Sequence, residues 1–316
     1  MKQKILVTWG MGFIGSNFLS WAVPKYPEID WICVDCLNYA ADTTNLASIS
    51  DASNFSFYKW NICDEIFLED VFQRGKPTDI IHFAAETHVD RSITDPKIFA
   101  LSNVLGTQNL LDMQRKYGLQ RFHHVSTDEV YGDIGAPYSS KETDLLEPSS
   151  PYSSTKAGSD LLVLSYVRTF DIDATISRCT NNYGPHQDLE KFIPRSIHRL
   201  KNNEPILLYG DGLNIRDWLH VQDHVEAIWQ IFTTGKSGEI YNIGSGNERS
   251  NREIAELLIT LMGKNLDLIQ YVQDRPGHDL RYSLDSTKIQ RELWWKAKVD
   301  FQTGLKDLVI SLTWKE

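Results

Sequence analysis

The sequence predicts an α/β fold, in which a Rossmann-type doubly wound parallel sheet carries a smaller C-terminal lobe. Two observations lead to this prediction. Short apolar runs alternate with helical patterns through the first half of the chain, and a glycine-rich segment follows the first of those runs. Such alternation is typical of parallel βαβ units. The chain has 316 residues, 41 % of them hydrophobic, which is enough for one such domain with an added lobe.

The first half of the chain is expected to run strand, helix, strand in regular order. Strands are expected at residues 4–8, 31–35, 56–58, 79–85, 121–126 and 174–178, and helices at 13–23, 97–117 and 152–170. Gly118 is expected to end the second of these helices, because glycine readily adopts the left-handed conformation found at helix ends.

The pattern changes in the second half of the chain. Polar loops there separate a few helices, and the strand signal at 239–243 stands alone. Ser250 and Glu253 form a capping-box pattern, which predicts that a helix begins at this point.

We therefore divide the chain into a Rossmann domain over residues 1–180 and a lobe over residues 181–316. The strand at 239–244 is expected to return to the Rossmann sheet. Ligands of doubly wound folds bind at the carboxyl edge of the sheet. The lobe is therefore expected to cover that edge and to bind the substrate.

Charge and composition exclude several classes of function. The formal net charge is −10 and the isoelectric point is near 5.4, which argues against binding a nucleic-acid backbone. No apolar run is long enough to cross a bilayer, and the N-terminal residues do not resemble a secretion signal. Cys33 and Cys36 form a C-x-x-C on a strand, not at the helix start that a redox motif requires. We expect a cytoplasmic protein without a metal site.

A glycine-rich segment is expected to bind a dinucleotide. Residues 8–15 read Thr-Trp-Gly-Met-Gly-Phe-Ile-Gly. This segment resembles the T-G-x-x-G-x-x-G motif of extended short-chain dehydrogenases/reductases, with Gly12 and Gly15 in register and Phe13 and Ile14 between them. Glycines at these positions let the backbone approach a pyrophosphate, whose charge is favoured at the N-terminus of the following helix.

The nature of the cofactor is indicated by Asp35, which ends the second expected strand. A carboxylate there accepts hydrogen bonds from ribose hydroxyls and repels a 2′-phosphate, so NAD is favoured over NADP. Asn61 stands where the family has an aspartate that bonds the adenine amino group, and an amide carbonyl accepts the same bond. The resemblance also implies cofactor contacts by Ile62, Ala84, Ala85, Thr87, Tyr152 and Lys156.

Three tryptophans stand where related sequences carry glycine. Trp9 replaces the first glycine of the dinucleotide motif, Trp60 falls in a segment that resembles G-D-I, and Trp294 falls in one that resembles L-G-W. An indole at position 9 is expected to crowd the turn or the pyrophosphate. A glycine codon translated as tryptophan, as happens where UGA is reassigned, would explain all three, and ordinary divergence is the alternative.

Tyr152 and Lys156 form a Y-x-x-x-K pattern at the start of an expected helix. Residues four apart lie on one face of a helix, so the ammonium group is expected to lie near the phenol and to lower its pKa. The Y-x-x-x-K pattern alone is common on solvated helices. Its position after the fifth strand, at the start of the next helix, makes it a specific indication of a catalytic pair.

Thr127, Asp128 and Glu129 leave the fifth strand within the segment His-Val-Ser-Thr-Asp-Glu-Val-Tyr-Gly. This segment resembles dTDP-glucose 4,6-dehydratases and their UDP-glucose relatives, in which Thr-Asp-Glu is the catalytic trio. The resemblance implies that Tyr152, assisted by Thr127 and Lys156, takes the C4 hydroxyl proton while NAD takes the hydride.

The same resemblance gives the two carboxyl groups different roles. Glu129 then removes the C5 proton as a base, Asp128 protonates the departing C6 hydroxyl as an acid, and the hydride returns to C6. An elimination needs an acid and a base held in different protonation states, and paired carboxyls suit that requirement.

The resemblance extends to segments on the sugar and nucleotide side. It implies substrate contacts by His88, Asn182, Glu190, Lys191, Arg216, Asn242, Arg275 and His278. Arginines suit a diphosphate because the guanidinium group donates paired hydrogen bonds. Asn103 matches a further family position, although an asparagine on a helix often serves packing.

The leading hypothesis is therefore a nucleotide-hexose 4,6-dehydratase that acts on dTDP-glucose, with UDP-glucose as the alternative. Other readings are a nucleotide-sugar epimerase or decarboxylase on the same fold, and a non-catalytic homologue whose NAD site is impaired by Trp9. The resemblance also implies a homodimer formed through helices that include 97–117 and 152–170.

Overall fold

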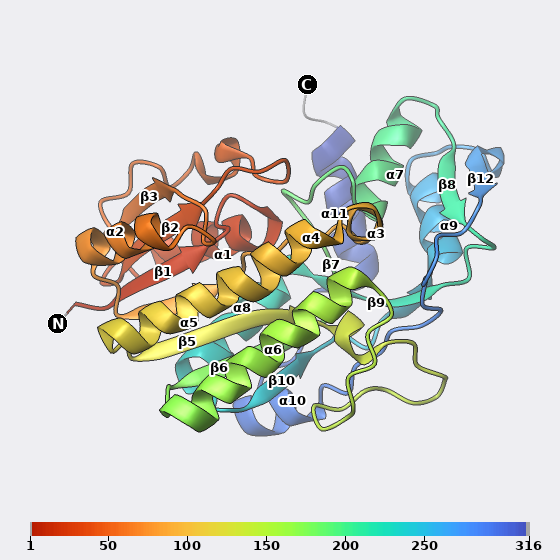
Figure 1. Ribbon diagram of the computed structural model, residues 1–316. Helices are drawn as coiled ribbons and strands as arrows, with labels where there is room; N and C mark the ends of the chain where they lie inside the picture. Colours follow the sequence, from red (N-terminus) through yellow and green to blue (C-terminus); the bar gives the residue numbers. More distant parts are fainter. Residues whose placement is uncertain (1, 314–316) are drawn as a thin grey trace.

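The computed structural model describes residues 2–313 and confirms the predicted fold class. Seven strands form one parallel sheet in the order β10-β6-β5-β4-β1-β2-β3 (Figure 1). These are β1 (Lys4–Thr8), β2 (Asp30–Asp35), β3 (Phe55–Lys59), β4 (Asp79–His82), β5 (Arg121–Thr127), β6 (Ala174–Cys179) and β10 (Ile240–Ile243). The chain order reverses between β1 and β4, where ligands of doubly wound folds bind.

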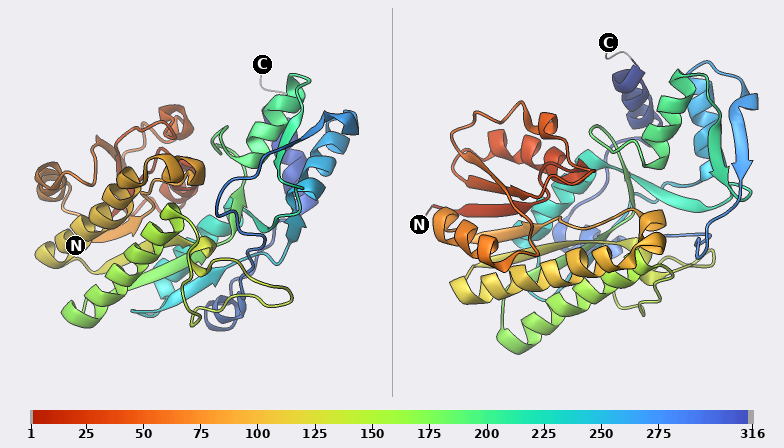
Figure 2. Two further views of the ribbon diagram at one scale, coloured as in Figure 1. Left: turned by 45° about the vertical axis from the view of Figure 1, so that its right-hand side comes forward. Right: turned by 45° about the horizontal axis from the view of Figure 1, so that its top comes forward.

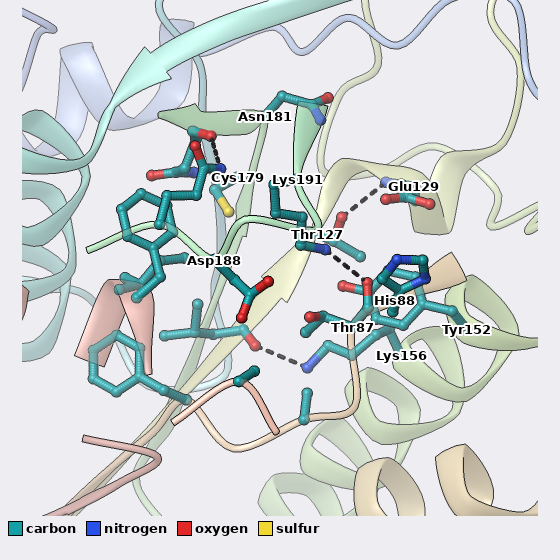
Figure 3. A pocket seen from close by; sticks show the side chains of 18 of the residues that line it. Thr87, His88, Thr127, Glu129, Tyr152, Lys156, Cys179, Asn181, Asp188 and Lys191 are labelled. Atoms are coloured by element: carbon teal, nitrogen blue, oxygen red, sulfur yellow. Dashed lines mark hydrogen bonds between the residues drawn. The ribbon is translucent and has the colours of Figure 1, made fainter. Parts of the chain in front are cut away.

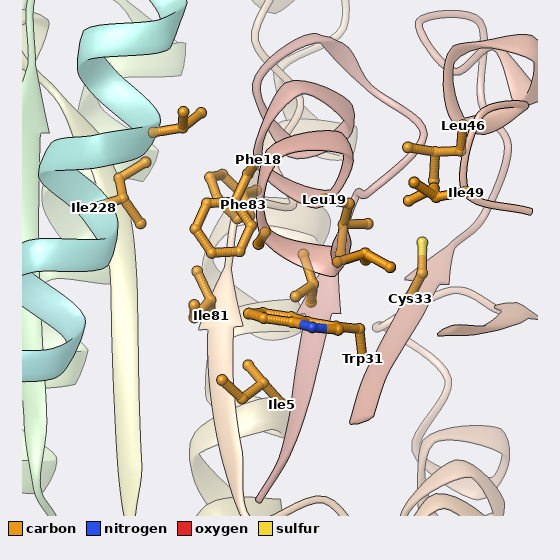
Figure 4. Packing of buried hydrophobic residues seen from close by; sticks show 14 of the residues in the cluster. Ile5, Phe18, Leu19, Trp31, Cys33, Leu46, Ile49, Ile81, Phe83 and Ile228 are labelled. Carbon is orange, nitrogen blue, oxygen red and sulfur yellow. The ribbon is translucent and has the colours of Figure 1, made fainter. Parts of the chain in front are cut away.

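Helices cover both faces of this sheet. On one face, α1 (Phe13–Lys25) packs beside α8 (Val221–Thr234). Their shared core contains Phe18, whose ring lies 5.8 Å from the Trp31 ring and 5.5 Å from the Phe83 ring (Figure 4). On the other face lie α2 (Glu65–Gly75), α5 (Gly106–Tyr117) and α6 (Pro151–Phe170).

The second half of the chain adds a lobe with a hydrophobic core of its own (Figure 2). A three-stranded sheet has the order β11-β9-β7, and β12 pairs with β8. The lobe comprises β7 (Asn181–Tyr183), α7 (Phe192–Lys201), β8 (Ile206–Tyr209), β9 (Ile215–His220), β11 (Glu248–Ser250), α9 (Asn251–Leu261), η4 (Leu266–Leu268), β12 (Ile269–Val272) and α11 (Phe301–Thr313). The capping box predicted at Ser250 and Glu253 is present at the start of α9.

The structure departs from the expected elements at several points. The helix expected over 97–117 is divided into α4 (Pro96–Phe99), a π-helical segment η2 (Ala100–Leu105) and α5, which ends at the left-handed Gly118 as expected. The strand expected over 79–85 ends at His82, because the next two backbone N–H groups donate to the Thr8 hydroxyl instead of continuing the sheet.

Helix α2 lies between β3 and β4, where the sequence analysis expected no helix. Helix α2 begins after Asp64, whose side chain accepts a hydrogen bond from the Phe67 N–H, and it buries Leu68, Val71 and Phe72. The remaining short elements are η1 (Thr43–Leu46), α3 (Val89–Thr94), η3 (Asp128–Tyr131) and α10 (Thr287–Leu293). Within residues 2–313, no helix is both long enough and apolar enough to span a bilayer.

Candidate active site

Three adjoining cavities lie at the carboxyl edge of the large sheet. The central cavity is lined by residues that include Trp9, Thr127, Glu129, Tyr152 and Lys191. The strand-edge cavity is lined by residues that include Trp9, Asp35, Trp60, Asn61, Ile62, Ala84 and Ala85. The lobe cavity is lined by residues that include Glu129, Lys191, Arg216, Arg275 and His278. Shared lining residues make the three cavities parts of one continuous site.

The carboxylate of Asp35 lies at the wall of the strand-edge cavity and is held by the backbone. It accepts hydrogen bonds from the N–H groups of Met11, at 3.0 Å, and Leu37, at 2.8 Å. Burial raises the pKa of this carboxyl group, and the two backbone hydrogen bonds oppose that effect. Asn61 lines the same cavity, but its side-chain oxygen already accepts a hydrogen bond from the Cys63 N–H at 2.9 Å.

The carboxyl groups of Asp128 and Glu129 lie where β5 passes into the 3-10 helix η3. Thr127 caps this helix, and its hydroxyl group accepts a hydrogen bond from the Glu129 N–H and donates one to Asp128 Oδ1 at 3.1 Å. Burial, reinforced by the Glu129 charge, raises the pKa of Asp128 to about 8. Asp128 therefore retains a proton at neutral pH, as an acid should.

Glu129 has a different electrostatic environment. Burial raises the pKa of its carboxyl group, but positive charges on Arg275, Arg216 and Lys191 act in the opposite direction. These cations favour the ionised form of Glu129. The negative charge of Glu129, in contrast, opposes ionisation of the Asp128 carboxyl group. The two carboxyl groups therefore have unequal environments, and only Glu129 has three cations that oppose the effect of burial on its pKa.

Tyr152 and Lys156 enter the central cavity from the first turns of α6 (Figure 3). Pro151 opens this helix, and Ser150 and Ser153 form a capping box, which fixes the orientation of the first turn. The Lys156 ammonium group donates to the Val125 carbonyl at 2.8 Å. Burial lowers the pKa of Lys156 to about 8, against the charge of Asp160.

The expected lowering of the Tyr152 pKa is wrong for this structure. Burial and the Glu129 charge raise the pKa of the phenol well above its usual value, and a hydrogen bond with Thr127 opposes them only in part. The physical reason is that the Lys156 ammonium group is directed to the backbone of β5 instead of to the phenol oxygen. Tyr152 is therefore a neutral phenol here.

A buried charged network lies behind Lys156. Its ammonium nitrogen is 3.3 Å from His124 Nε2, which is 3.5 Å from Asp160 Oδ1. Arg178 donates to the other Asp160 oxygen at 2.8 Å. Although burial opposes it, the Arg178 charge lowers the pKa of Asp160 to about 2, and burial lowers the pKa of His124 to about 4. A fixed negative charge thus stands behind Lys156.

The lobe cavity gathers the cationic residues that the sequence singled out. Arg275 pairs with Asp90 at 3.0 Å, and Arg216 donates to the backbone carbonyls of Ile215 and Asp279. These contacts hold both guanidinium groups at the cavity wall. Burial lowers the pKa of His278, which lies 2.7 Å from Asp274.

Residues at the junction of the central and lobe cavities are also fixed by local contacts. Lys191 donates to the Thr87 carbonyl at 3.0 Å. Glu190 pairs with Arg91 and lies 3.5 Å from His88, so its carboxylate is already compensated by neighbouring charge. Six of the described residues line both the central and the lobe cavity: Thr87, His88, Glu129, Asn181, Glu190 and Lys191.

Two asparagines singled out by the sequence serve the fold instead. Asn242, expected to contact substrate, is completely buried outside the three cavities, and its amide joins the Tyr131 hydroxyl and the Ser140 carbonyl. Asn103 is likewise buried, and its amide bonds the backbone of Glu86. A matching sequence segment identifies the position of Asn242 but not the side of the strand on which its side chain lies.

Two asparagines, Asn181 and Asn182, lie at the start of the lobe, and the sequence analysis expected only Asn182 to contact substrate. Asn182 lines the central cavity, but its amide is engaged by His224 and the Thr180 carbonyl. The adjacent Asn181 lines both the central and lobe cavities, and its buried side-chain oxygen has no hydrogen-bond partner within the described chain. Successive residues of a strand face opposite sides, a signal that the sequence contains. The sequence prediction names Asn182 in this segment and does not name Asn181.

The backbone at Trp9 and Trp294 adopts the left-handed conformation. Their φ angles are 55° and 57°, whereas Trp60 is absent from the left-handed residues of the described chain. Left-handed backbone costs an L-residue about 1–2 kcal/mol. The turn expected at position 9 is thus present, and position 294 has the same type of backbone. At position 60 the indole packs on Phe67, with 4.3 Å between the ring centroids.

Known proteins resemble this chain along almost all of its length. A family model described as GDP-mannose 4,6 dehydratase matches residues 6–308. The dTDP-glucose 4,6-dehydratase of Actinoplanes sp. is 46 % identical over 313 residues, which cover 97 % of each chain. That of Mycolicibacterium smegmatis is 44 % identical over 310 residues, which cover 97 % of this chain and 92 % of the relative. The chain belongs to the dTDP-glucose 4,6-dehydratase family.

Solved structures agree with this membership. DesIV, a dTDP-glucose 4,6-dehydratase from Streptomyces venezuelae solved with NAD and TYD bound, has a TM-score of 0.94 and 44 % identity, with 97 % of this chain and 96 % of that chain covered. A UDP-glucose 4-epimerase from Thermotoga maritima, solved with UDP-glucose, has a TM-score of 0.90 and 30 % identity, with 97 % of each chain covered. Dehydratases and epimerases therefore share this fold.

NAD is the cofactor of this dehydratase family, and the site suits it at both ends. Asp35 lies at the strand-edge cavity, and Tyr152 and Lys156 lie at the central cavity. Gly12 begins α1 without a side-chain cap, which leaves backbone N–H groups for a pyrophosphate. Trp9 lies between these two ends, since it lines both cavities. Within the described residues, no cluster of His, Cys, Asp and Glu is suited to a metal ion.

The charge behind Lys156 gives a testable pH dependence. Asp160→Asn removes the carboxylate that favours protonated Lys156, so the pKa of Lys156 should fall from about 8. The alkaline limb of NAD reduction should move down by about one pH unit, which corresponds to about 1.4 kcal/mol. The profile is measured in an Asp128→Asn background, because Asp128 titrates in the same range.

Ser159→Ala is the matched control, since it removes a neutral hydroxyl from the same network. It should leave the alkaline limb in place. An alkaline limb that Asp160→Asn does not move would contradict the assigned role of Asp160.

Proposed function

We propose that this chain converts dTDP-glucose to dTDP-4-keto-6-deoxyglucose and water. The single observation that carries the proposal is the buried pair Asp128 and Glu129 beside Tyr152. Burial raises the pKa of Asp128 to about 8, whereas positive charges on Arg275, Arg216 and Lys191 oppose the rise that burial causes in the pKa of Glu129. Membership of the dTDP-glucose 4,6-dehydratase family supports the same conclusion.

The proposed reaction begins at the C4 hydroxyl group of the sugar. Tyr152 accepts the proton of this hydroxyl, with Thr127 and Lys156 as its polar neighbours. NAD, when bound, accepts the C4 hydride and later returns it to C6. The phenol of Tyr152 is neutral in the structure, so its deprotonation must accompany binding of the positively charged nicotinamide and of the substrate.

The two carboxyl groups carry out the elimination. The C4 ketone acidifies the C5 proton, which Glu129 removes as an ionised base. Asp128 donates its proton to the C6 hydroxyl group, and the C6–O bond breaks to release water. When the hydride returns to C6, Glu129 gives the proton that it removed back to C5. The proton that Tyr152 accepted from the C4 hydroxyl group replaces the one that Asp128 lost to water, so the reaction balances over one turnover.

The lobe cavity is proposed to hold the nucleotide. Arg216 and Arg275 are placed to bind a diphosphate, because guanidinium groups donate paired hydrogen bonds to phosphate oxygens. Asn181, His88 and Lys191 border both the central and lobe cavities and are proposed to contact the sugar between them. Asn182, Glu190 and His278 are also proposed to contact the substrate, because each lines the central or the lobe cavity.

An epimerase is the second candidate, because the Thermotoga maritima UDP-glucose 4-epimerase shares the fold. Epimerisation at C4 requires oxidation and re-reduction but no acid and base at C5 and C6. The buried carboxyl pair would then have no function in the reaction and would only destabilise the site, since burial of carboxyl groups is unfavourable. We therefore favour the dehydratase.

The proposal includes a homodimer in the cytoplasm. Leu101, Leu105 and Leu161 are exposed on η2 and α6, which lie side by side on one face (Figure 1). Exposed apolar side chains gathered on adjacent helices are typical of subunit interfaces. The four free cysteines are compatible with a reducing compartment.

The choice of nucleotide is tested by supplying dTDP-glucose and UDP-glucose separately, each with added NAD. Formation of a 4-keto sugar is followed by its alkali-dependent absorbance. We expect kcat/KM to be at least about tenfold higher for dTDP-glucose, a difference of about 1.4 kcal/mol in the transition state. Equal or higher kcat/KM for UDP-glucose would refute the nucleotide assignment. Absence of a keto sugar from either substrate, in both this chain and its Trp9→Gly variant, would refute the dehydratase.

The role of Glu129 is tested by Glu129→Gln. Because this group acts after oxidation, dehydration should fall by roughly 10²–10⁴-fold while reduction of NAD persists. Both are measured in single turnovers, by product analysis and by the absorbance of reduced NAD. Tyr152→Phe is the matched control and should abolish both steps. Near-full dehydration by Glu129→Gln would remove this residue from the mechanism.

The proposed dimer is tested by Leu161→Glu, which places a charge in the centre of the apolar face. Light scattering should give the mass of a dimer for the parent chain and of a monomer for the variant. Leu266→Glu is the control, because Leu266 is similarly exposed but lies in the lobe. A monomeric parent chain, or a Leu161→Glu variant that remains dimeric, would contradict the proposed interface.

A further inference from the structure

Trp9 occupies the turn between β1 and α1, directly at the start of the helix. Its N–H donates to the Val34 carbonyl at 2.8 Å, and its carbonyl accepts a hydrogen bond from the Gly12 N–H. A Cβ atom added at Gly12 would lie 2.7 Å from two atoms of the Trp9 indole. The indole therefore lies against the N-terminus of α1, where backbone N–H groups are available to an anion.

The Trp9 indole lies between the central cavity and the strand-edge cavity, which together form the expected dinucleotide site. Trp9 and Ala85 line both the central and the strand-edge cavity. A dinucleotide in this fold places its pyrophosphate at the N-terminus of the first helix, with its two nucleosides on either side. The space that the pyrophosphate needs is thus the space beside Gly12 that the indole fills. The indole nitrogen is buried there without a hydrogen-bond partner in the described chain.

Trp294 is a second tryptophan whose backbone has a positive φ angle. It ends helix α10 with φ 57° and ψ 21°, the left-handed conformation that glycine favours at helix ends. Its side chain is 90 % exposed, so no packing compensates for the strained backbone. Seven non-glycine residues of the described chain have positive φ, and they include asparagine and aspartate, which tolerate it. Tryptophan has no such tolerance.

We infer that positions 9 and 294 are glycine in the protein as its source organism makes it, and that the Trp9 indole obstructs NAD binding in the present chain. Both backbone positions favour glycine for conformational reasons, although Leu37 and Lys76 show that other residues of this chain adopt the same conformation. Position 9 also favours glycine because an indole there lies against the helix N-terminus. Position 60 lies outside this inference, because its backbone makes no such demand.

The obstruction is tested by NAD binding in the absence of sugar, measured by calorimetry on the full chain. Trp9→Gly should lower the NAD dissociation constant by about tenfold or more. Trp9→Ala should also tighten binding, because it removes the indole. Trp9→Ala should nevertheless unfold at a lower temperature than Trp9→Gly, because it keeps a Cβ atom on a left-handed backbone. Unchanged NAD affinity in both variants would overturn the obstruction.

Trp294→Gly is the matched control for the backbone effect alone. Position 294 has nearly the same φ as position 9 but borders none of the three cavities. This variant should unfold at a higher temperature than the parent and bind NAD with the same affinity. A lower unfolding temperature would overturn the assignment of glycine to position 294.

The codons at positions 9 and 294 of the gene, read by DNA sequencing, test the origin of the two tryptophans. Positions 9 and 294 should carry UGA, a codon that the source organism would read as glycine, whereas the buried Trp31, Trp218 and Trp295 should carry UGG. Mass spectrometry of the protein purified from its source should find glycine at both positions. UGG at either position would overturn the codon assignment there.

The inference rests on one part of the proposed function, namely that the protein binds NAD. Tight NAD binding by Trp9→Gly without formation of a keto sugar would refute the proposed reaction and leave the inference intact. Tight NAD binding by the parent chain, unchanged by Trp9→Gly, would refute the inference alone.

Discussion

The burial of two adjacent carboxyl groups is the constraint on which the site depends. Asp128 and Glu129 leave the end of β5 together, and burial makes ionisation of both unfavourable. The cations Arg216, Arg275 and Lys191 favour the ionised form of Glu129, while Asp128 retains a proton. The lobe supplies all three cations. The lobe therefore sets the electrostatics of the pair as well as forming the wall of the cavity.

The sheet places the remaining groups around this pair. Tyr152 and Lys156 come from α6, whose first turn is fixed by its capping box, and Lys156 is anchored to the carbonyl of Val125. The charge of Asp160 lies behind Lys156 and is itself held by Arg178. Each group that would move a proton is thus positioned by a second residue. The ordered parallel sheet supplies the frame in which these contacts form.

The β1–α1 turn is the place where local and global requirements conflict. The fold needs left-handed backbone there, and a dinucleotide needs open space beside Gly12. Tryptophan adopts the left-handed backbone at an energetic cost, and its indole occupies the space beside Gly12. Neighbouring groups such as Asp35 and Lys156 line the cavities as expected. Such a conflict confined to one position, in a site otherwise complete, distinguishes a single altered residue from the gradual loss of a site.

Much of the fold followed from local patterns in the sequence. The alternation of apolar runs with helices predicted the parallel sheet, and the chemistry of Thr127, Asp128, Glu129, Tyr152 and Lys156 predicted a cluster that the structure brings to one cavity. Helix α2 was missed because its apolar residues were not recognised as one face of a helix.

The contacts that could not be predicted are those set by tertiary packing. Asn181 and Asn182 both line the central cavity, but contacts with His224 and Thr180 decide that the Asn182 amide is already engaged. The burial of Asn242 likewise depends on its contact with Tyr131. The bond from Lys156 to β5 joins residues 31 apart in the sequence. No local pattern contains such information, because it arises only when the strands and helices are assembled.

Transfer of deuterium from C4 to C6 would test the central claim most directly. The Trp9→Gly variant, with added NAD, would be supplied with dTDP-glucose that carries deuterium at C4, and the product would be analysed by mass spectrometry and NMR. The account predicts a 4-keto-6-deoxy sugar with the deuterium at C6. A 4-keto product without deuterium at C6, or an epimerised sugar that retains deuterium at C4, would contradict it.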